Sequence, residues 1–451
     1  MRELTSGNPA KMIFTFAVPI ALGALFQQLY SMIDTVIVGR TIGVEAIAAL
    51  GSTSYISNLI IGFMSGLTNG FAIVTARHFG AGDEVKMRRS VAGTIFLGLA
   101  VSAVFTILSM IFLRPFLRIL NTPEEIFETS YSYISIILLF MTAAMLYNMS
   151  AGVLRAVGDS VTPLVFLIIS SFLNIGLDLL FIVKLSMGVR GAAYATVVSQ
   201  VFSFAMCCVY IGIRFPYLIP RKEELKVTAH ELSELMAMGL SLALMFSIVE
   251  IGSLILQRAI NNFGTDTIAA HTAARKISSI LMLPFSAFGS ACATYCSQNL
   301  GAGRPERVGK GIKSAIIMCW IWSAAAVAVG YIFAPSIISW IAGTEEKFIV
   351  ELASRYMRVN TPFYFILAVL VVMRSSLQGL GRKTIPVASS VIEMVGKAVV
   401  AFAAAPALGY FGVMISEPIV WFFMTILLVW GYARDRELVK ATFVKENKYL
   451  N

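Results

Sequence analysis

Phe79-Gly80-Ala81-Gly82-Asp83 follows a long apolar stretch, and Leu300-Gly301-Ala302-Gly303-Arg304 follows another such stretch 221 positions later. Further residues return at the same shift: Ile47-Ala48-Ala49 as Ile268-Ala269-Ala270, Gly188 as Gly409, and Gly191 as Gly412. Gly158 and Pro163 return as Gly381 and Pro386, two residues out of step, as one small insertion would produce. A fixed period of this kind indicates an internal duplication, so the chain consists of two copies of one unit of roughly 220 residues.

The composition places both copies in a lipid bilayer. Hydrophobic residues make up 58% of the chain and charged residues 13%, and the mean hydropathy is +0.81. A soluble domain carries about 25% charged residues, so a chain with this composition is too apolar to expose its surface to water. A membrane-spanning helix needs about 20 apolar residues, and the continuous apolar runs predict about twelve such helices. They lie near residues 12–38, 46–75, 90–113, 131–153, 162–184, 191–213, 236–260, 267–297, 312–334, 358–380, 385–405 and 410–432.

The two copies meet at a polar segment near residues 214–235. Phe215-Pro216-Tyr217 and the charged run Arg221-Lys222-Glu223-Glu224 interrupt the apolar pattern there. We therefore predict an N-lobe at 1–225 with the first six spans and a C-lobe at 226–451 with the last six. Because each copy has an even number of spans, both begin on the same side of the membrane, which makes them parallel repeats. Many secondary transporters are built from two such lobes around a central path.

The positions of the positive charges predict the orientation of the chain. The net charge is +10. If the N-terminus is inside, the loops on that side carry most of the Lys and Arg residues, as the positive-inside rule requires. We therefore expect both termini in the cytoplasm of a cell whose plasma membrane holds the protein. The excess charge is explained by topology and by contact with anionic lipid, so we predict no nucleic-acid partner.

Ionisable residues within the spans are the strongest functional signal. Each costs roughly 2.5–3.5 kcal/mol at the bilayer centre, and Asp34, Asp178 and Glu250 all lie in predicted spans. Asn174 and Asp178 are four residues apart and share one helix face. Their oxygens suit a small hard cation such as Na⁺, or a proton site, and Thr196 could add a hydroxyl. The alternative is a structural polar cluster that holds helices together.

Three further features of the spans have both a functional and a structural interpretation. Pro19 interrupts the hydrogen bonding of the first span and is either a hinge or a structural kink. Glu393 and Lys397 are four residues apart and could pair with each other. Abundant Met and aromatic residues could line an adaptable pocket for apolar cations, or could simply pack against helices and lipid. The candidates for a cavity include Tyr30, Met32, Tyr133, Met145 and Met149.

Together these motifs resemble bacterial transporters of the multidrug and toxic compound extrusion (MATE) family. The resemblance covers nearly the whole chain. It is carried by the two glycine-rich loops, by Leu154-Arg155-Ala156-Val157-Gly158-Asp159-Ser160-Val161-Thr162-Pro163 after the fourth span, and by Asn174-Ile175-Gly176-Leu177-Asp178 in the fifth. The family exports cationic and amphipathic drugs in exchange for Na⁺ or H⁺. The resemblance also favours a monomer and implies no cofactor beyond that coupling ion.

The resemblance implies roles for individual residues. Asp34, Asn174, Asp178 and Thr196 match the N-lobe cation site of the family, and Pro19 matches the proline at which its first span bends. Gln27 and Tyr133 fall where polar cavity residues are expected. Glu250 matches a seventh-span glutamate of members that have a C-lobe cation site. Those members also place an aspartate in the tenth span, whereas the stretch 361–380 of this chain contains no carboxylate.

We therefore hypothesise an antiporter whose two lobes form a V that opens alternately to each side. The alternative within the same superfamily is a flippase for lipids or lipid-linked oligosaccharides, which would favour a cationic cavity; Arg275, Lys276 and Arg374 are the residues that could form one. An enzyme is disfavoured because the three His residues are scattered. No nucleotide-binding loop is present, so we do not expect ATP to drive transport.

Overall fold

The computed structural model describes residues 4–119, 122–342 and 345–449, which form helices with no strand among them. Eleven helical segments in this described part are long and apolar enough to cross a membrane. A twelfth span results if Glu124–Leu139 and Met141–Ala156, which are bent by 46° at Phe140, count as one. Each of the twelve predicted spans corresponds to one of these segments. The prediction of an all-α polytopic membrane protein is therefore confirmed.

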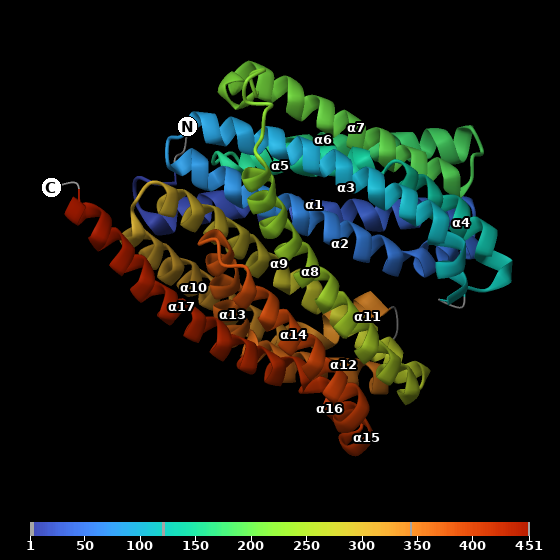
Figure 1. Cartoon of the computed structure of the whole chain (residues 1–451). Helices are drawn as coiled ribbons and strands as arrows, with labels where there is room; N and C mark the ends of the chain where they lie inside the picture. The colour runs from blue at the N-terminus through green and yellow to red at the C-terminus, as the bar shows by residue number, and fades with distance from the viewer. Residues whose placement is uncertain (1–3, 120–121, 343–344, 450–451) are drawn as a thin grey trace. The chain divides into compact units, whose positions relative to one another are not determined.

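Figure 1 shows the order of the helices along the chain. The first repeat contains α1 (Pro9–Thr41), α2 (Val44–Gly80), α3 (Glu84–Ile119), α4 (Glu124–Leu139), α5 (Met141–Ala156), α6 (Val161–Asp178) and α7 (Val189–Arg214). The second repeat contains α8 (Ala229–Ile260), α9 (Thr265–Gly301), α10 (Pro305–Ala328), α11 (Ala334–Ala342), α12 (Lys347–Asn360), α13 (Tyr364–Gly379), α14 (Thr384–Val399), α15 (Ala405–Leu408), α16 (Tyr410–Met414) and α17 (Ser416–Tyr449). Short π-helical turns at Leu179–Lys184, Val329–Phe333 and Val400–Ala404 extend α6, α10 and α14.

The duplication seen in the sequence is repeated in the backbone. Helices α2 and α9 each have 37 residues, and they begin 221 positions apart. Apart from Gly7, the glycines with positive φ in the described residues occur in matching pairs: Gly43 with Gly264, Gly82 with Gly303, Gly158 with Gly381, and Gly188 with Gly409. Gly82 (φ 67°) and Gly303 (φ 66°) end α2 and α9 in the left-handed conformation that glycine adopts most readily. The two copies therefore share their turns as well as their spans.

The chain folds into two compact units whose boundaries lie within α1 and α8, the first helices of the two repeats. One unit consists of Leu22–Ala243, and the other combines the described residues before Leu22 with those from Leu244 on. The start of α1 thus belongs with the second repeat, and the start of α8 belongs with the first. The lobes at 1–225 and 226–451 stay a prediction made from the repeats along the chain, whereas the compact units divide within these two helices.

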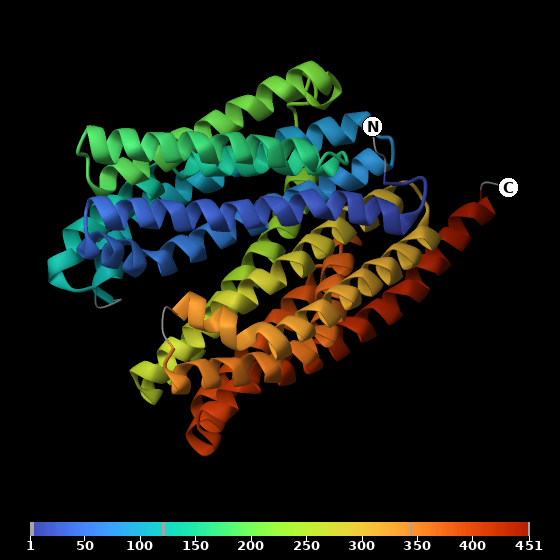
Figure 2. The ribbon, with the colours of Figure 1, turned by 180° about the vertical axis from the view of Figure 1, so that it is seen from behind.

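Inside the first unit, α6 and α7 lie side by side in both views of the ribbon (Figures 1 and 2). The start of α8 packs closely on α2 through small residues. A Cβ atom placed on Gly66 would lie 2.6 Å from the backbone of Ala243, and one on Gly70 would lie 2.5 Å from the Cα of Gly239. Small residues four positions apart on both helices permit this close approach, which is typical of helix packing in membranes.

The segment between the repeats is anchored to the first unit by ion pairs. Arg88 of α3 donates from Nε to Glu224 Oε1 at 2.8 Å, and the two side chains are only 6% and 8% exposed. Arg77 and Arg89 pair in the same way with Glu234 and Glu231 of α8. Burial opposes ionisation of Glu224, but the backbone N–H of Arg221 and the Arg88 guanidinium outweigh it, so the pKa of this carboxyl lies below its ordinary value.

We expect this pair to make stability depend on pH. Because the folded-state pKa of Glu224 is below the ordinary value of about 4.5, its contribution is complete above that pH and is lost as pH falls through the folded value. Glu224→Gln should lower the free energy of unfolding by roughly 1–3 kcal/mol at pH 7. The difference from wild type should shrink towards pH 4 in thermal melts of the detergent-solubilised protein.

The matched control for this prediction is Lys86→Gln. Lys86 pairs with Asp83 at 3.1 Å, but its side chain is 60% exposed, so its loss should cost at most about 1 kcal/mol. A constant difference between wild type and Glu224→Gln from pH 7 to pH 4 would contradict the assignment of this pH dependence to Glu224.

Candidate functional site

Two acidic side chains from different helices face each other in the first unit. The carboxyl groups of Asp34 on α1 and Asp178 at the end of α6 lie within hydrogen-bonding range of one another. Asp178 is fully buried, and neither of its oxygens accepts a hydrogen bond from a donor in the described part of the protein. Asp34 Oδ1 is buried and equally without a donor. The structure therefore brings together two of the residues selected from the sequence.

Asn174 completes this cluster on α6. It lies one helical turn before Asp178, on the same face, and is 2% exposed. Its amide nitrogen and oxygen both lack hydrogen-bond partners among the described residues. A buried polar group without a partner costs roughly 1–3 kcal/mol, so such a cluster needs a reason. Helix α6 passes into a π-helical turn immediately after Asp178, a distortion that is frequent at functional sites.

Two tyrosines lie close to both carboxyl groups. Tyr30 on α1 and Tyr133 on α4 are each near enough for their hydroxyls to interact electrostatically with Asp34 and Asp178. The side chain of Gln27 lies within hydrogen-bonding range of the Tyr30 hydroxyl. Gln27, Tyr30 and Tyr133 were all predicted to line a cavity. The two tyrosines lie near the acidic pair, and Gln27 lies beside Tyr30.

The other residues predicted for this region have different surroundings. The Thr196 hydroxyl donates to the Ala192 carbonyl of its own helix at 3.1 Å, which leaves its lone pairs available to a ligand. Met145 and Met149 are buried and lie against Gly98 of α3, so they belong to the packing of α5 on α3. Met32 is 55% exposed. Roles for these four residues in ion or substrate binding stay predictions.

Glu250 is not part of the acidic cluster. It lies on α8 in the second unit and is exposed. Within the described residues, no hydrogen bond or ion pair joins it to another side chain, so the structure supplies neither the partner nor the second carboxylate that a C-lobe cation site needs.

Pro19 lies inside α1, two residues before the point at which this helix passes from one compact unit to the other. Proline has no N–H, so it cannot donate to the carbonyl of Thr15. The helix therefore lacks one backbone hydrogen bond close to the point where it changes units, and the role of Pro19 as a hinge stays a prediction.

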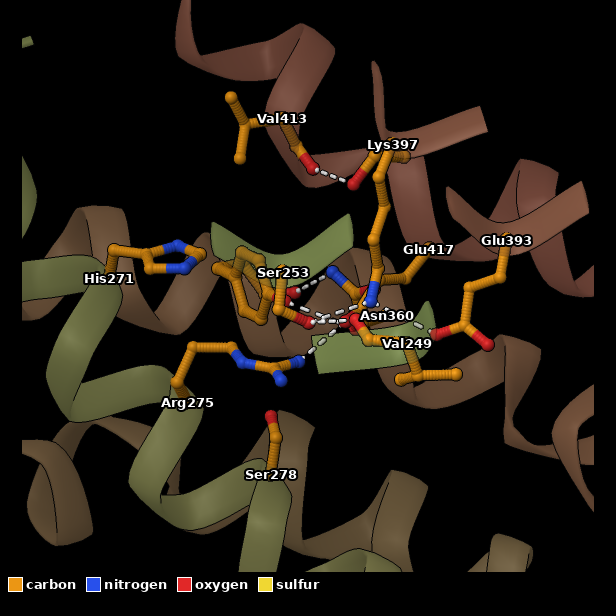
Figure 3. A network of polar contacts seen from close by, with 12 residues as sticks. Val249, Ser253, His271, Arg275, Ser278, Asn360, Glu393, Lys397, Val413 and Glu417 are labelled. Atoms are coloured by element: carbon orange, nitrogen blue, oxygen red, sulfur yellow. Dashed lines mark hydrogen bonds and ion pairs between the residues drawn. The ribbon is translucent and has the colours of Figure 1, made fainter. Parts of the chain in front are cut away.

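The second unit contains two ion-pair groups, shown together in Figure 3. In one, Arg275 of α9 donates to Glu417 of α17 at 2.6 Å, and Tyr356 donates to the same carboxylate. In the other, Lys397 of α14 donates to Glu393 at 3.0 Å, as their spacing in the sequence suggested. Glu417 was missed in the sequence, although its position as a carboxylate inside the predicted span 410–432 could have identified it.

The acidic pair of the first unit can bind one positive charge. Two carboxylates about 4 Å apart repel each other by about 4 kcal/mol at an effective dielectric constant of 20. In buried surroundings such a pair either takes up a proton, which neutralises one carboxylate, or binds a cation, which allows both to stay ionised. Asn174 can add an amide oxygen to a cation ligand set. In the described part of the chain, no three His, Cys, Asp or Glu side chains gather to form a larger metal site.

Comparison with known proteins agrees with this architecture. The model of the MatE family matches residues 19–180 and 241–403, which together are more than half of the chain. This chain belongs to the MatE family. The two matched ranges begin 222 positions apart, so the family model detects each repeat separately. MatE proteins are membrane transporters and not enzymes.

Individual relatives extend the match over most of the chain. The probable multidrug resistance protein YoeA of Bacillus subtilis is 26% identical, with 92% of each chain covered. The FAD transporter of Shewanella oneidensis is 22% identical, with 97% of this chain and 98% of the relative covered. A crystal structure of MATE in the bent conformation superposes with a TM-score of 0.91, covers 98% of both chains and is 23% identical, which supports the fold.

Proposed function

We propose that this MatE protein is an efflux antiporter that exchanges a proton or Na⁺ for cationic, amphipathic compounds. The observation that carries the proposal is the buried pair of Asp34 and Asp178, which face each other without a donor to neutralise them. A coupling ion that binds between these carboxyls removes their repulsion. Na⁺ would also use Asn174 and the Thr196 hydroxyl, whereas a proton needs only the two carboxyls.

Competition for the same negative charge couples the ion to the substrate. An organic cation close to Asp34 and Asp178 is attracted when the pair carries excess negative charge and loses this attraction when the ion is bound. Each ligand therefore favours release of the other, which is negative coupling between two sites. Gln27, Tyr30 and Tyr133 lie near these carboxyls and would contact the substrate.

The membrane potential is large enough to drive the exchange of one coupling ion for a neutral compound. Exchange for one monovalent cation moves no net charge, so the concentration gradient of the coupling ion drives it. Moving one charge inward across 100 mV is worth about 2.3 kcal/mol. A factor of ten in concentration requires about 1.4 kcal/mol. One ion per transport cycle can therefore support an approximately 50-fold gradient of a neutral compound, since no second charge then moves.

Pro19 is the proposed hinge of alternating access, in which the two lobes open to each side in turn. Its position at the change of units in α1 supports this role. Replacing Pro19 by Ala supplies the missing N–H to the Thr15 carbonyl and stiffens the helix. Dye export should then slow while the protein stays folded; an unchanged rate would argue against the hinge.

The flippase alternative is weakened by the surroundings of the cations that suggested it. Arg275 is neutralised by Glu417, Arg374 lies 3.6 Å from Glu393, and Lys276 is exposed. Arg275 and Arg374 pair with different carboxylates, which argues against one cationic site that all three residues share in the described part of the second unit. We also propose a plasma-membrane location, cytoplasmic termini and a monomeric state, in line with the distribution of Lys and Arg and with the family.

The decisive experiment uses sealed vesicles that contain the purified protein in inside-out orientation. A fluorescent dye cation is supplied outside, and a proton gradient or a Na⁺ gradient is imposed in separate trials. One of the two gradients should drive accumulation of the dye, and that gradient identifies the coupling ion. Absence of accumulation under both gradients would refute the antiport proposal.

A further inference from the structure

A cluster of three charged side chains in the second unit is not used by the proposed cation site. Lys397 of α14 donates from Nζ to Glu393 Oε1 and to Ser253 Oγ of α8, both at 3.0 Å. Arg374 of α13 donates from Nε to Ser389 Oγ at 3.1 Å, and its Nη2 lies 3.6 Å from Glu393 Oε2. Figure 3 shows the Lys397 ammonium directed at the Glu393 carboxylate.

The charges of this cluster do not balance. It contains two cations and one carboxylate, and the three side chains are between 5% and 14% exposed. Among the described residues, Glu393 is the acidic group whose charge reaches Arg374, and Lys397 and Arg374 are the cations that reach Glu393. One positive charge is therefore left over in membrane-spanning segments, where an unbalanced charge costs roughly 2.5–3.5 kcal/mol.

The hydrogen-bonding capacity of the cluster is also incomplete. Arg374 Nη2 is buried and donates no hydrogen bond within the described part of the protein. A guanidinium presents paired N–H groups in a planar fork that fits the two oxygens of a carboxylate or phosphate. The unused donor is Arg374 Nη2, and the surplus positive charge is that of the whole cluster. One anionic group could accept the hydrogen bond and balance the charge.

Comparison of the two repeats shows that the second carries a positive charge at a position where the first has a neutral amide. Pro163 and Pro386 are each the third residue of their helices, α6 and α14. Asn174 follows the first proline by eleven residues, and Lys397 follows the second proline by eleven. The repeat position that contributes an amide oxygen beside the acidic pair in the first unit therefore carries an ammonium group in the second.

We propose that Arg374 and Lys397 bind an anionic group, a carboxylate or a phosphate, of a zwitterionic or anionic ligand, and that Glu393 occupies their charges when this ligand is absent. The anionic group can belong to a transported compound or to a lipid headgroup. The inference deepens the proposed efflux function, because it adds zwitterions to the cations that the acidic pair selects.

The test compares two rhodamine dyes that differ in one group. The free acid carries a carboxylate and is a zwitterion, whereas its ethyl ester is a cation. Arg374→Gln and Lys397→Gln should each raise KM for the acid at least about tenfold more than KM for the ester, since a hydrogen bond to a charged group is lost. Glu393→Gln should lower KM for the acid, because it removes the competing carboxylate. Lys276→Gln, which alters an exposed cation on α9, is the matched control and should change neither KM.

Three outcomes would overturn the anion site and leave a structural ion cluster. The first is an equal change in KM for both dyes in the Arg374 and Lys397 variants, and the second is an unchanged KM for the acid in Glu393→Gln. The third is unfolding of both Gln variants together with unaltered selectivity in the charge-conserving Arg374→Lys. Melting temperatures in detergent identify variants that fail to fold.

Direct binding separates this inference from the efflux proposal. Quenching of dye fluorescence by detergent-solubilised protein reports the affinity for the acid even where vesicles show no export. Weaker binding of the acid by Arg374→Gln than by wild type would support the site without any transport. Vesicles with and without phosphatidylglycerol then identify the source of the anion. If this lipid raises KM for the acid in wild type but not in Arg374→Gln, the site takes headgroups; if it has no effect, the site takes the transported compound.

Discussion

Accumulation of a dye cation against its gradient should stop when Asp34 is replaced by Asn. The variant keeps the size and polarity of the side chain but leaves Asp178 as the single carboxyl of the pair. Without the repulsion between two carboxylates, the coupling ion no longer controls the affinity for the substrate. In one-for-one exchange, a tenfold gradient of the coupling ion supports a dye gradient of about tenfold. This gradient should fall to about onefold in the variant, whereas downhill movement of the dye should continue.

The measurement is dye uptake in the vesicles described above, under whichever ion gradient drives the wild type. Asp178→Asn should give the same result as Asp34→Asn, and the double variant should be no worse than either single variant, because the two residues act as a pair. Glu45→Gln is the matched control, since Glu45 is an exposed carboxylate of α2 outside the candidate site. Uptake at the wild-type level in Asp34→Asn would remove the basis for assigning ion coupling to this pair.

Folding should be sensitive to a single methyl group on Gly70. A Cβ atom there would lie 2.5 Å from the Cα and 2.6 Å from the backbone nitrogen of Gly239. Neither atom belongs to a flexible side chain, so α2 and α8 would have to separate. Gly70→Ala should destabilise the protein by about 1–3 kcal/mol, as overpacking of a tight interface does. Gly70→Val adds two further methyl groups and should abolish recovery of folded protein.

Gly51→Ala provides the control on the same helix. No atom lies within 4 Å of a Cβ built on Gly51, and alanine is the better helix former by roughly 0.5–1 kcal/mol. Its melting temperature in detergent should equal or exceed that of the wild type. Equal melting temperatures for Gly70→Ala and Gly51→Ala would show that α2 and α8 do not approach as closely as the structure indicates.

The candidate site was only partly accessible from the sequence. Asn174 and Asp178 could be placed on one face because the α-helix determines the geometry of residues four apart. The pairing of Glu393 with Lys397 was accessible for the same reason, and the structure confirms it. The position of Asp34 opposite Asp178 was not accessible from spacing, because the two residues lie on helices far apart in the chain. The resemblance to a known family suggested that association before the structure provided it.

The sequence by itself determined the membrane environment, the duplication and the approximate limits of the spans, because apolar length and recurring glycines are properties of the local chain. Only the tertiary structure decided which charges meet: Asp34 with Asp178, Arg275 with Glu417, and Arg374 with the carboxylate that Lys397 already binds. It also decided that α1 and α8 divide their lengths between the two units. The physical reason is that a helix in lipid is apolar on nearly every face. Its rotation and depth are therefore set by packing against its neighbours.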